Sequence, residues 1–550
     1  MYARTVQTMA LLGSLVILCL ASVLAQTEGD RVELIMSKLP SQNSATYRAI
    51  RKLAGNATGQ VLPLTKSEMW SVPKEKVDAV RKAAAAYGAS VYQLGDDWNE
   101  VFHPMPGAKG TAERRKVVKE RARSSKETMQ IFMTEKQKIM RERAKASRGT
   151  MNVAMMLAPP PWAVEYALTK DASANAPARI RLPINEKTVL TIKRTAVTVK
   201  SDVIIWRGTV DGIGLPVTLM WWPDGKMTGT VQHEGRLYSI RHMGGEMHAV
   251  VEMSVEQMPP EHASITSRPR LDDPNLRDEP LVDQGHTGVL RAVTAQAAKP
   301  TALAAHGAAP SPPEVIIDVI VAYTKKAASN YTDVKRELVD LAIEETNESF
   351  RNSKLDYVKL RLVHAYQTDY VEEGDYFDHV WRFADADDGY MEEIHDLRSK
   401  YHADVLVLIV DDPKGCGLAT RVFADAEDAF AVVHHACAAT TYSLAHEIGH
   451  LIGARHDLYS DNIMTPFPYG HGYVNDTKWR DIMSLRESCG GCPRLPVWSS
   501  PKVMINGEPA GTPELDNARV IAEQAARVAA FRESPAEQQD RTKREEGPLR

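Results

Sequence analysis

Two histidines and a glutamate stand together in the run His446-Glu447-Ile448-Gly449-His450. His446 and His450 are four residues apart, so on a helix they lie on one face, one turn from each other. Two imidazoles at that spacing can reach one metal ion while Glu447 projects beside it. The run therefore predicts a helix that presents two metal ligands and an adjacent carboxylate.

A third histidine follows at an offset that completes this pattern. Gly453 favours the left-handed conformation that ends a helix and turns the chain, and the turn brings His456 back as a third nitrogen ligand. Three histidines leave one position of a tetrahedral zinc ion for water, as catalytic rather than structural sites do. The shorter H-E-x-x-H run can arise on any amphipathic helix, but Gly453 and His456 at these offsets favour a catalytic zinc site.

Length and composition set the context for this site. A chain of 550 residues exceeds one ordinary domain, so two to four structural units are expected. A hydrophobic content of 43% suffices for packed cores, and a net charge of -4 gives no argument for a nucleic-acid partner. No internal segment approaches the ~20 apolar residues of a membrane-spanning helix.

The N-terminus has the pattern of a signal peptide. Arg4 precedes an apolar run from Met9 to Leu20, and small residues suited to cleavage lead up to Ala25. We therefore predict that residues 1–25 are a signal peptide and that the protein is secreted, to the extracellular space or the periplasm. An uncleaved anchor is the alternative, although the apolar run is short for a membrane span.

Cysteine placement agrees with export. Cys19 would leave with the signal peptide, and the remaining four cysteines all lie near the histidine cluster. An even number in an exported chain indicates disulfides, of which the simplest pairing is Cys416–Cys437 and Cys489–Cys492. The other two pairings stay open, as does a second zinc on four thiolates, although only Cys489 and Cys492 show C-x-x-C spacing.

Two regions precede the domain that carries the histidines. Residues 26–150 are polar and are predicted to be largely helical, with a helix at Lys74–Tyr87 and a basic stretch at Thr111–Arg148. Residues 151–258 change to a period of two and predict a β-rich domain with a meander-like sheet. Its expected strands include Thr188–Ile192, Val203–Trp206, Val217–Trp221, Gly229–His233 and Arg236–Arg241.

A linker and an αβ domain complete the chain. Residues 259–313 are rich in Pro, Ala and Asp and are predicted to be an exposed linker that holds a maturation site. Residues 314–534 predict an α+β domain, and the charged residues 535–550 a disordered tail. The expected strands of the domain are Val315–Tyr323, Val358–Ala365, Ala403–Val410 and Ala429–His434. Its expected helices are Thr332–Phe350, Gly389–Tyr401, Thr441–Ile452 and Asn517–Phe531.

From about Val315 onward, the chain resembles bacterial secreted metzincins of the peptidyl-Asp metalloendopeptidase family, and an Asp directly after the third histidine is similar to reprolysins among them. The resemblance implies a metzincin catalytic domain, with a twisted mixed sheet and an active-site helix. The β-rich region before the linker looks like the family's propeptide, and residues 26–150 match it less specifically. The segments that carry the resemblance are Ala429–His434, His446–Asp457, Tyr469–Tyr473, Trp479–Met483, Cys492–Arg494 and Asp516–Val520.

The resemblance also implies roles for individual residues. His446, His450 and His456 would hold one zinc ion, and Glu447 would be the general base that takes a proton from the attacking water and passes it to the leaving amine. Metzincins carry a Met-turn below the metal, which we assign to Met483.

Alternatives remain for the Met-turn and for the roles of the other histidines. Met464 competes with Met483 for the Met-turn, and Leu485 stands where several family members carry a tyrosine. His434, His435 and His471 are expected to be structural or to line the cleft, because three nitrogens already complete the site.

Preference for an Asp substrate requires a cation in the pocket for the residue after the cleaved bond, and Arg suits that by its bidentate fork. Arg480, Arg486 and Arg494 fall in the relevant segment, and we favour Arg494. Calcium stays an alternative at the acidic stretch Asp385–Asp388, where an exposed turn is favoured because no regular calcium-loop spacing appears.

These patterns lead to a hypothesis of a secreted zinc endopeptidase, made as a zymogen, that acts on proteins or peptides and is inhibited by its own propeptide. Residues 26–415 contain no cysteine, so a propeptide thiol cannot block the metal. A propeptide carboxylate, a histidine or steric cover must do so instead. The alternatives are a broad-specificity reprolysin-like protease and a catalytically silent zinc-binding adhesion or inhibitor module.

Overall fold

A computed structural model describes much of the chain, and its contacts divide it into two compact units. One unit comprises Met1–Gln257 with Tyr331–Glu337, and the other comprises Met258–Asn330 with Leu338–Arg550. The predicted signal peptide, the basic stretch, most of the linker and the tail lie outside the described residues. The structure describes residues 31–37, 39–56, 59–61, 67–93, 103–104, 153–157, 179–184, 188–200, 203–211, 216–244, 247–253, 258–261, 312–374 and 376–532.

A small sheet forms from residues 31–93, where the sequence predicted mainly helix. The strands pair in the order β2-β3-β1-β4, and a buried cluster that includes Leu34, Trp70 and Val80 joins the sheet to its two helices. The elements are β1 (Arg31–Ser37), α2 (Ala45–Leu53), β2 (Gly59–Val61), β3 (Glu68–Pro73), α3 (Val77–Ala85) and β4 (Ser90–Gln93). Only α3 was expected, although about half of the residues of β1 and β3 are apolar.

An antiparallel nine-stranded sheet dominates the rest of this unit. From β7 to β13 the strands are neighbours in chain order, so the sheet has the expected meander, with β6 and β5 added at one edge. Each of the five expected strands is present. The strands are β5 (His103–Pro104), β6 (Val153–Leu157), β7 (Arg179–Pro183), β8 (Val189–Lys200), β9 (Val203–Val210), β10 (Pro216–Trp221), β11 (Met227–His233), β12 (Arg236–Gly244) and β13 (Met247–Met253).

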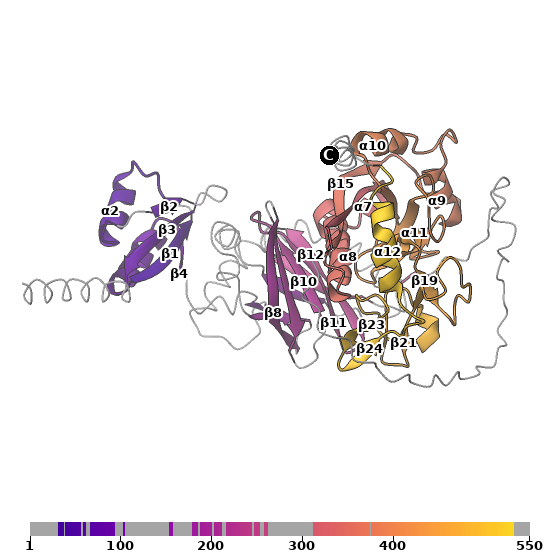
Figure 1. Ribbon diagram of the computed structural model, residues 1–550. Coiled ribbons are helices and arrows are strands. Elements are labelled where there is room, and N and C mark those ends of the chain that lie inside the picture. Colours follow the sequence, from indigo (N-terminus) through magenta and orange to yellow (C-terminus); the bar gives the residue numbers. More distant parts are fainter. Residues whose placement is uncertain are drawn as a thin grey trace, which may run out of the picture. The chain divides into compact units, whose positions relative to one another are not determined.

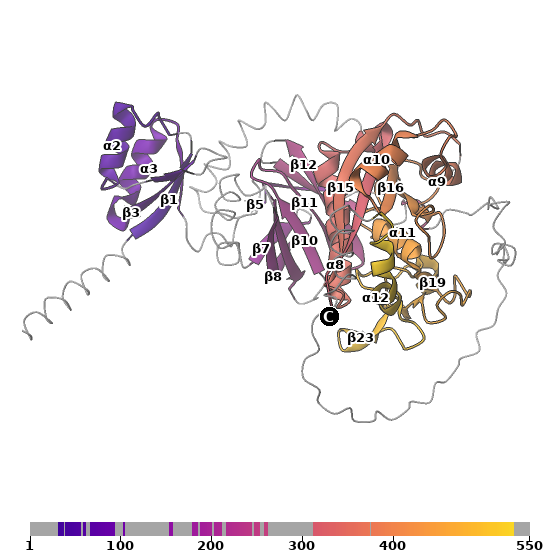
Figure 2. The same ribbon diagram turned by 45° about the horizontal axis from the view of Figure 1, so that its top comes forward.

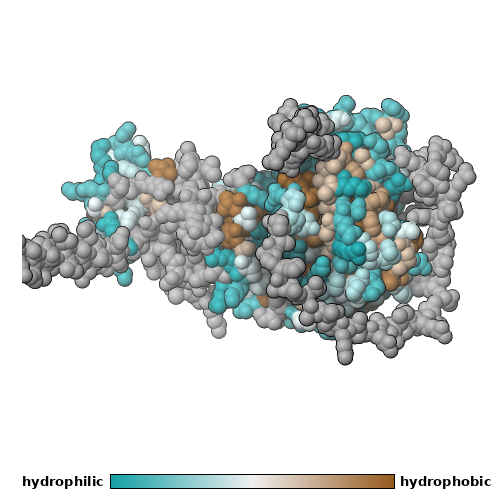
Figure 3. Space-filling view, viewed as in Figure 1, coloured by the Kyte–Doolittle hydropathy of each residue, from teal (hydrophilic) through white to brown (hydrophobic). Residues whose placement is uncertain are grey.

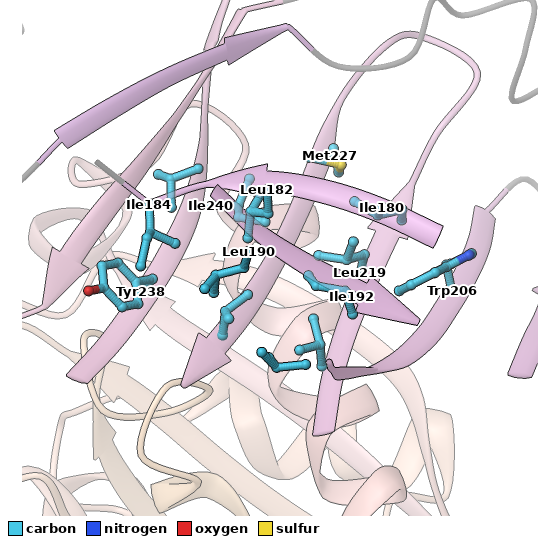
Figure 4. Packing of buried hydrophobic residues seen from close by; sticks show 14 of the residues in the cluster. Ile180, Leu182, Ile184, Leu190, Ile192, Trp206, Leu219, Met227, Tyr238 and Ile240 are labelled. Atoms are coloured by element: carbon cyan, nitrogen blue, oxygen red, sulfur yellow. The ribbon is translucent and has the colours of Figure 1, made fainter. Parts of the chain in front are cut away.

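One face of this sheet carries a hydrophobic core. Alternate residues of neighbouring strands point to the same side, so Trp206, Leu219 and Ile192 come together there (Figure 4). Tyr238 belongs to the same cluster and lies farther across the sheet. This period of two is the pattern from which the sequence predicted the strands.

Residues 331–337 belong to the same unit by their contacts, although they follow the linker in sequence. The Lys226 ammonium lies 2.6 Å from an Asp333 carboxylate oxygen, Arg336 pairs with Asp224, and the Arg241 guanidinium lies 4.5 Å from the centre of the Tyr331 ring. The predicted helix Thr332–Phe350 consists of a π-helical first part at Lys335–Asp340 that continues directly into α8 at Leu341–Asn352.

The second unit is built on a five-stranded mixed sheet in the order β15-β14-β16-β18-β17. Four strands are parallel and β17 is antiparallel to β18 at the edge. The inner strands are continuous apolar runs because both faces of a parallel sheet are covered. The strands are β14 (Val315–Thr324), β15 (Val358–Thr368), β16 (Val405–Val410), β17 (Gly417–Ala419) and β18 (Phe430–His434).

Helices complete this α+β unit and position its functional side chains. Helices α11 (Ser443–Ile452) and α8 contact each other, and α12 (Asn517–Val528) lies beside α11 in both views (Figures 1 and 2). A second cluster joins α9 (Tyr376–Ala384) and α10 (Glu393–Tyr401) to the sheet through Phe383, Ile394 and Phe430. The outer face of α12 is hydrophilic (Figure 3), and no helix among the described residues is long and apolar enough to cross a membrane.

Candidate functional site

Helix α11 carries the first two histidines and is buried along its whole length. The helix ends at Gly453, where φ is 131° and the N–H donates to the Gly449 carbonyl oxygen. That backbone conformation suits glycine, and it turns the chain into β19 (Arg455–Asp457). The turn places His456 against the helix, as the spacing predicted.

The three histidine rings converge through their Nε2 atoms. Nε2 of His456 lies 3.1 Å from that of His446 and 3.0 Å from that of His450. On the far side of each helical ring, Nδ1 of His446 lies 2.9 Å from the Ile482 carbonyl oxygen, and Nδ1 of His450 lies 2.9 Å from the Ala454 carbonyl oxygen. A carbonyl only accepts, so the proton of each ring is on Nδ1 and the Nε2 lone pair points inward.

This arrangement fits a metal ion. The inward-facing lone pairs of His446 and His450 lie close enough to the third imidazole nitrogen for one cation to be shared by all three rings. Nitrogen ligands of a tetrahedral zinc ion stand about 3.3 Å from one another, given zinc–nitrogen bonds of ~2.0–2.1 Å. The three residues are also one of two groups among the described residues whose ligand atoms could hold an ion.

Glu447 lies fully buried on the same helix. Neither carboxylate oxygen has a partner at hydrogen-bonding geometry among the residues that the structure describes. Burial raises the pKa of this carboxyl to about 8, against the opposing effects of the Arg494 charge and the Ala419 N–H. A carboxylate kept away from other protein partners is suited to exchange a proton with a water molecule or a substrate.

Gly417, in the edge strand β17, makes room for that carboxylate. A Cβ atom built on Gly417 would lie 2.1 Å from Oε1 of Glu447, well inside van der Waals contact. No signal for this role is present in the sequence, because the pairing of β17 with β18 becomes apparent only in the fold.

Met483, the predicted Met-turn residue, lies against α11, where a Cβ atom on Gly449 would be 2.9 Å from its sulfur. It is fully buried, and the preceding residue, Ile482, supplies the carbonyl oxygen that orients His446. Asp481 fixes the turn by accepting hydrogen bonds from the Ser484 N–H at 2.9 Å and the Ser499 N–H at 3.0 Å. The competing Met464 has 48% of its surface exposed and is therefore a poor candidate for a floor beneath the metal.

Substitution of Gly449 tests the packing of α11 against Met483 and Trp498. A Cβ atom there would lie 2.6 Å from the Trp498 ring and 2.9 Å from the Met483 sulfur. Glycine to alanine ordinarily stabilises a helix interior by about 1 kcal/mol. We expect Gly449→Ala instead to destabilise the protein by about 1–3 kcal/mol, as overpacking does. Thermal unfolding measures the sign, and a stabilised variant would contradict the tight packing.

Residues around His456 connect it to the neighbouring loops. An Asp457 carboxylate oxygen accepts a hydrogen bond from the Leu485 N–H at 3.0 Å, which joins the His456 strand to the loop after Met483. Nδ1 of the buried His471 lies 2.9 Å from the His456 carbonyl oxygen. His471 is thus a structural neighbour of the site, in agreement with the sequence-based interpretation.

Both expected disulfides are present. Cys416–Cys437 joins the start of the edge strand to the segment before α11, and Cys489–Cys492 closes a short loop after Met483. Both bonds therefore fix segments that border the histidine site.

The three candidate arginines have different surroundings. Arg480 and Arg494 are buried and lie in a parallel β-bridge with each other, while Arg486 is half-buried. Arg494 donates to the Thr441 carbonyl oxygen at 2.9 Å and to that of Ser484 at 3.2 Å. Burial, followed by the Arg494 charge, lowers the pKa of Arg480 to about 10.

His434 and His435 form the second potential metal-holding group, with Asp411. Nε2 of His434 and Nε2 of His435 lie 3.6 Å and 3.4 Å from an Asp411 carboxylate oxygen. The acidic stretch Asp385–Asp388 forms a largely exposed bend, where the Glu392 carboxylate accepts the Asp387 N–H. An exposed turn was the favoured interpretation of that stretch.

Comparison with known proteins gives a family match, similar sequences and a solved structure. The Reprolysin_5 model, described as metallo-peptidase family M12, matches residues 314–498. A peptidyl-Asp metalloendopeptidase of Xanthomonas campestris pv. campestris is 33% identical over 394 residues, which is 68% of this chain and 88% of that protein. Another, from Stenotrophomonas maltophilia, is 33% identical over 398 residues, with the same shares covered. The crystal structure of metalloproteinase-II from Bacteroides fragilis is 12% identical, with a TM-score of 0.32 over 58% of this chain and 87% of that one.

Proposed function

Because the chain belongs to the peptidyl-Asp metalloendopeptidase family and is therefore a metalloendopeptidase, we propose that it is a secreted zinc enzyme made as a zymogen. In this proposal it hydrolyses peptide bonds of proteins, with a preference for bonds N-terminal to Asp. The observation that carries the proposal is the convergence of three histidine Nε2 atoms, 3.0 and 3.1 Å apart, beside the buried Glu447.

In this proposal the histidines and Glu447 have different roles. His446, His450 and His456 hold the ion, and the Ile482 and Ala454 carbonyl oxygens keep two of these rings in the required tautomer. A zinc ion held there would supply Lewis-acid polarisation of the substrate carbonyl and a more acidic water.

Glu447 is the proposed general base and then the general acid. It takes a proton from the attacking water and passes it to the leaving amine nitrogen. Its burial supports this role, because the raised pKa, about 8, allows the carboxyl to hold the proton between the two transfers. Asp481 holds the turn whose Ile482 carbonyl oxygen orients His446, and Met483 is the proposed Met-turn residue.

Metal analysis combined with cleavage mapping tests the proposal. We expect one zinc per mature chain, loss of casein hydrolysis on chelation, and recovery when zinc is restored. Cleavage of a denatured proteome should yield peptides that begin predominantly with Asp. Cleavage without such a bias would favour the broad reprolysin-like alternative, and bound zinc without cleavage would favour the silent module.

Maturation provides a separate test of the zymogen. The predicted linker contains Asp272, Asp273, Asp278 and Asp283, which an Asp-preferring enzyme could use to process itself. The Glu447→Gln chain should therefore accumulate at precursor length without its signal peptide. The wild-type chain should yield a product that begins between about Asp272 and Val315. N-terminal sequencing of both products measures this, and normal maturation of the inactive variant in a protease-deficient host would exclude self-processing.

A further inference from the structure

The segment Met258–Glu261 lies against the catalytic unit, at the start of the predicted linker. The Pro260 carbonyl oxygen accepts a hydrogen bond of 2.7 Å from the Cys416 N–H. Cys416 directly precedes the edge strand β17, whose Gly417 faces Glu447. An extended peptide commonly binds a sheet edge through such backbone hydrogen bonds. The segment therefore contacts the chain directly before the sheet edge that borders the catalytic carboxylate.

The side chain of Glu261 enters a pocket made by two arginines. One carboxylate oxygen pairs with Arg480, and the other lies 3.0 Å from a guanidinium nitrogen of Arg494. The second oxygen also accepts the Arg486 N–H at 2.7 Å. The Glu261 side chain is 9% exposed, and those of Arg480 and Arg494 are each 4% exposed.

The pocket is shaped for a carboxylate. Arg480 also donates to the carbonyl oxygens of Ser484 and Cys492, so its guanidinium is fixed in place. Burial alone would raise the pKa of the Glu261 carboxyl, but Arg494, Arg480 and the Arg486 N–H outweigh it and hold the pKa below its ordinary value. A neutral side chain would leave the two buried guanidinium charges without a counter-charge, which is costly.

The two arginines of this pocket also contact segments that border the histidine site. Arg494 donates to the carbonyl oxygen of Thr441, which stands two residues before α11 begins. Arg480 and Arg494 both donate to the Ser484 carbonyl oxygen, directly after Met483. The positive charge of Arg494 also acts on the Glu447 carboxyl. The pocket is thus next to the site where the proposed function places the reacting bond.

On the basis of the proposed function, we propose that Glu261 is a pseudo-substrate residue that keeps the precursor latent by filling the acid-binding pocket of Arg480 and Arg494. The same two arginines then select an acidic residue of the substrate when the segment leaves. Our sequence-based interpretation favoured Arg494 alone as the selector, and the contacts of Glu261 add Arg480 to it.

The prolines before Glu261 suit an inhibitor better than a substrate. Pro259 and Pro260 have no backbone N–H, so at these positions the segment can accept hydrogen bonds from the sheet edge but cannot donate any. The rings also restrict the backbone dihedral φ, so the segment has less freedom to adjust toward a hydrolysable geometry.

Peptide binding to the full-length precursor tests the proposal. The probe is a fluorescein-labelled peptide with one Asp, and its partner peptide has Asn at that position. In a Glu447→Gln background, which prevents processing, Glu261→Gln should tighten binding of the Asp peptide by about tenfold to a hundredfold, as expected when competing charge-assisted hydrogen bonds are weakened. The Asn peptide should change by much less. Fluorescence anisotropy at equal zinc occupancy measures both.

Glu314→Gln is the matched control, because Glu314 is an exposed carboxylate of the same unit that pairs with Lys359. This control should bind both peptides as the parent does. Unchanged binding of the Asp peptide to the Glu261→Gln precursor would overturn the proposal. Equal tightening for the Asp and Asn peptides would overturn its acid-recognition part, since steric cover alone would explain that result.

A second measurement does not depend on the folding of a variant. A synthetic peptide spanning residues 254–264 should inhibit mature wild-type enzyme, and the same peptide with Gln at position 261 should inhibit at least about tenfold more weakly. Equal inhibition by the two peptides would overturn the proposal. Failure of the proposed function has a different signature, because the mature enzyme would then hydrolyse neither casein nor the Asp peptide in the absence of any inhibitor.

Discussion

Replacement of Glu447 by Gln is expected to lower the kcat for peptide hydrolysis by about 10²–10⁴ without loss of metal. Glutamine keeps the shape of the side chain but cannot accept and return a proton at neutral pH. The three histidine ligands are unchanged, so zinc content should equal that of the wild-type protein. Burial raises the pKa of this carboxyl, so a neutral amide at this position should not reduce stability.

The measurement combines kcat, zinc per chain and thermal unfolding on chains that have been matured by an added protease. Glu523→Gln is the control, because Glu523 is an exposed acid on α12 that pairs with Arg519. It should keep full activity. A Glu447→Gln enzyme with wild-type kcat would exclude the proposed general base.

Replacement of Gly417 by Ala is expected to lower kcat by about 10², again with zinc retained. The new methyl group would lie 2.1 Å from Oε1 and 2.7 Å from Cδ of Glu447, so the carboxylate must move. A displacement of about 1 Å at a catalytic group can cost a factor of that size. The histidines are not among the atoms nearest to this methyl group, so metal binding should persist.

A double variant distinguishes this steric effect from general damage. If Gly417→Ala acts through Glu447, it should cost little more once Glu447→Gln is already present, because the two changes affect one group. Ala419→Gly, two residues along the same strand, is the control for altered strand packing. Additive losses in the double variant would show that the methyl group acts elsewhere.

The convergence of the three histidines could be predicted from sequence because it is local. His446 and His450 share a helical face by spacing alone, and Gly453 places the turn that returns His456. The apolar runs at Val315–Thr324 and Val405–Val410 likewise predict buried parallel strands. In such cases the period of a short segment determines both its structure and the direction of its side chains.

The remaining parts of the site depend on contacts distant in sequence. Gly417 faces Glu447 only because the short strand β17 turns back against β18, and a three-residue strand has no detectable period. The pairing of Arg480 with Arg494 arises from a β-bridge between the two-residue strand Trp479–Arg480 and a later loop. Burial of Glu261 could not be foreseen either, because the sequence around it is typical of an exposed linker.

The start of helix Thr332–Phe350 also makes contacts distant in sequence. Its sequence predicts one continuous helix, and Asp333 and Arg336 make ion pairs with the nine-stranded sheet's Lys226 and Asp224. The helix is uninterrupted, but its first part, Lys335–Asp340, is π-helical and continues directly into α8.

Those ion pairs also affect the release of the N-terminal fragment after the linker is cut. Residues 331–337 lie on the C-terminal side of the predicted linker, yet they contact a sheet on its N-terminal side. A cut within the linker therefore separates the covalent chain without breaking the pairs of Lys226 with Asp333 and of Asp224 with Arg336. The two fragments should co-elute at low ionic strength and dissociate as salt rises, so that release of the sheet is a step distinct from backbone cleavage.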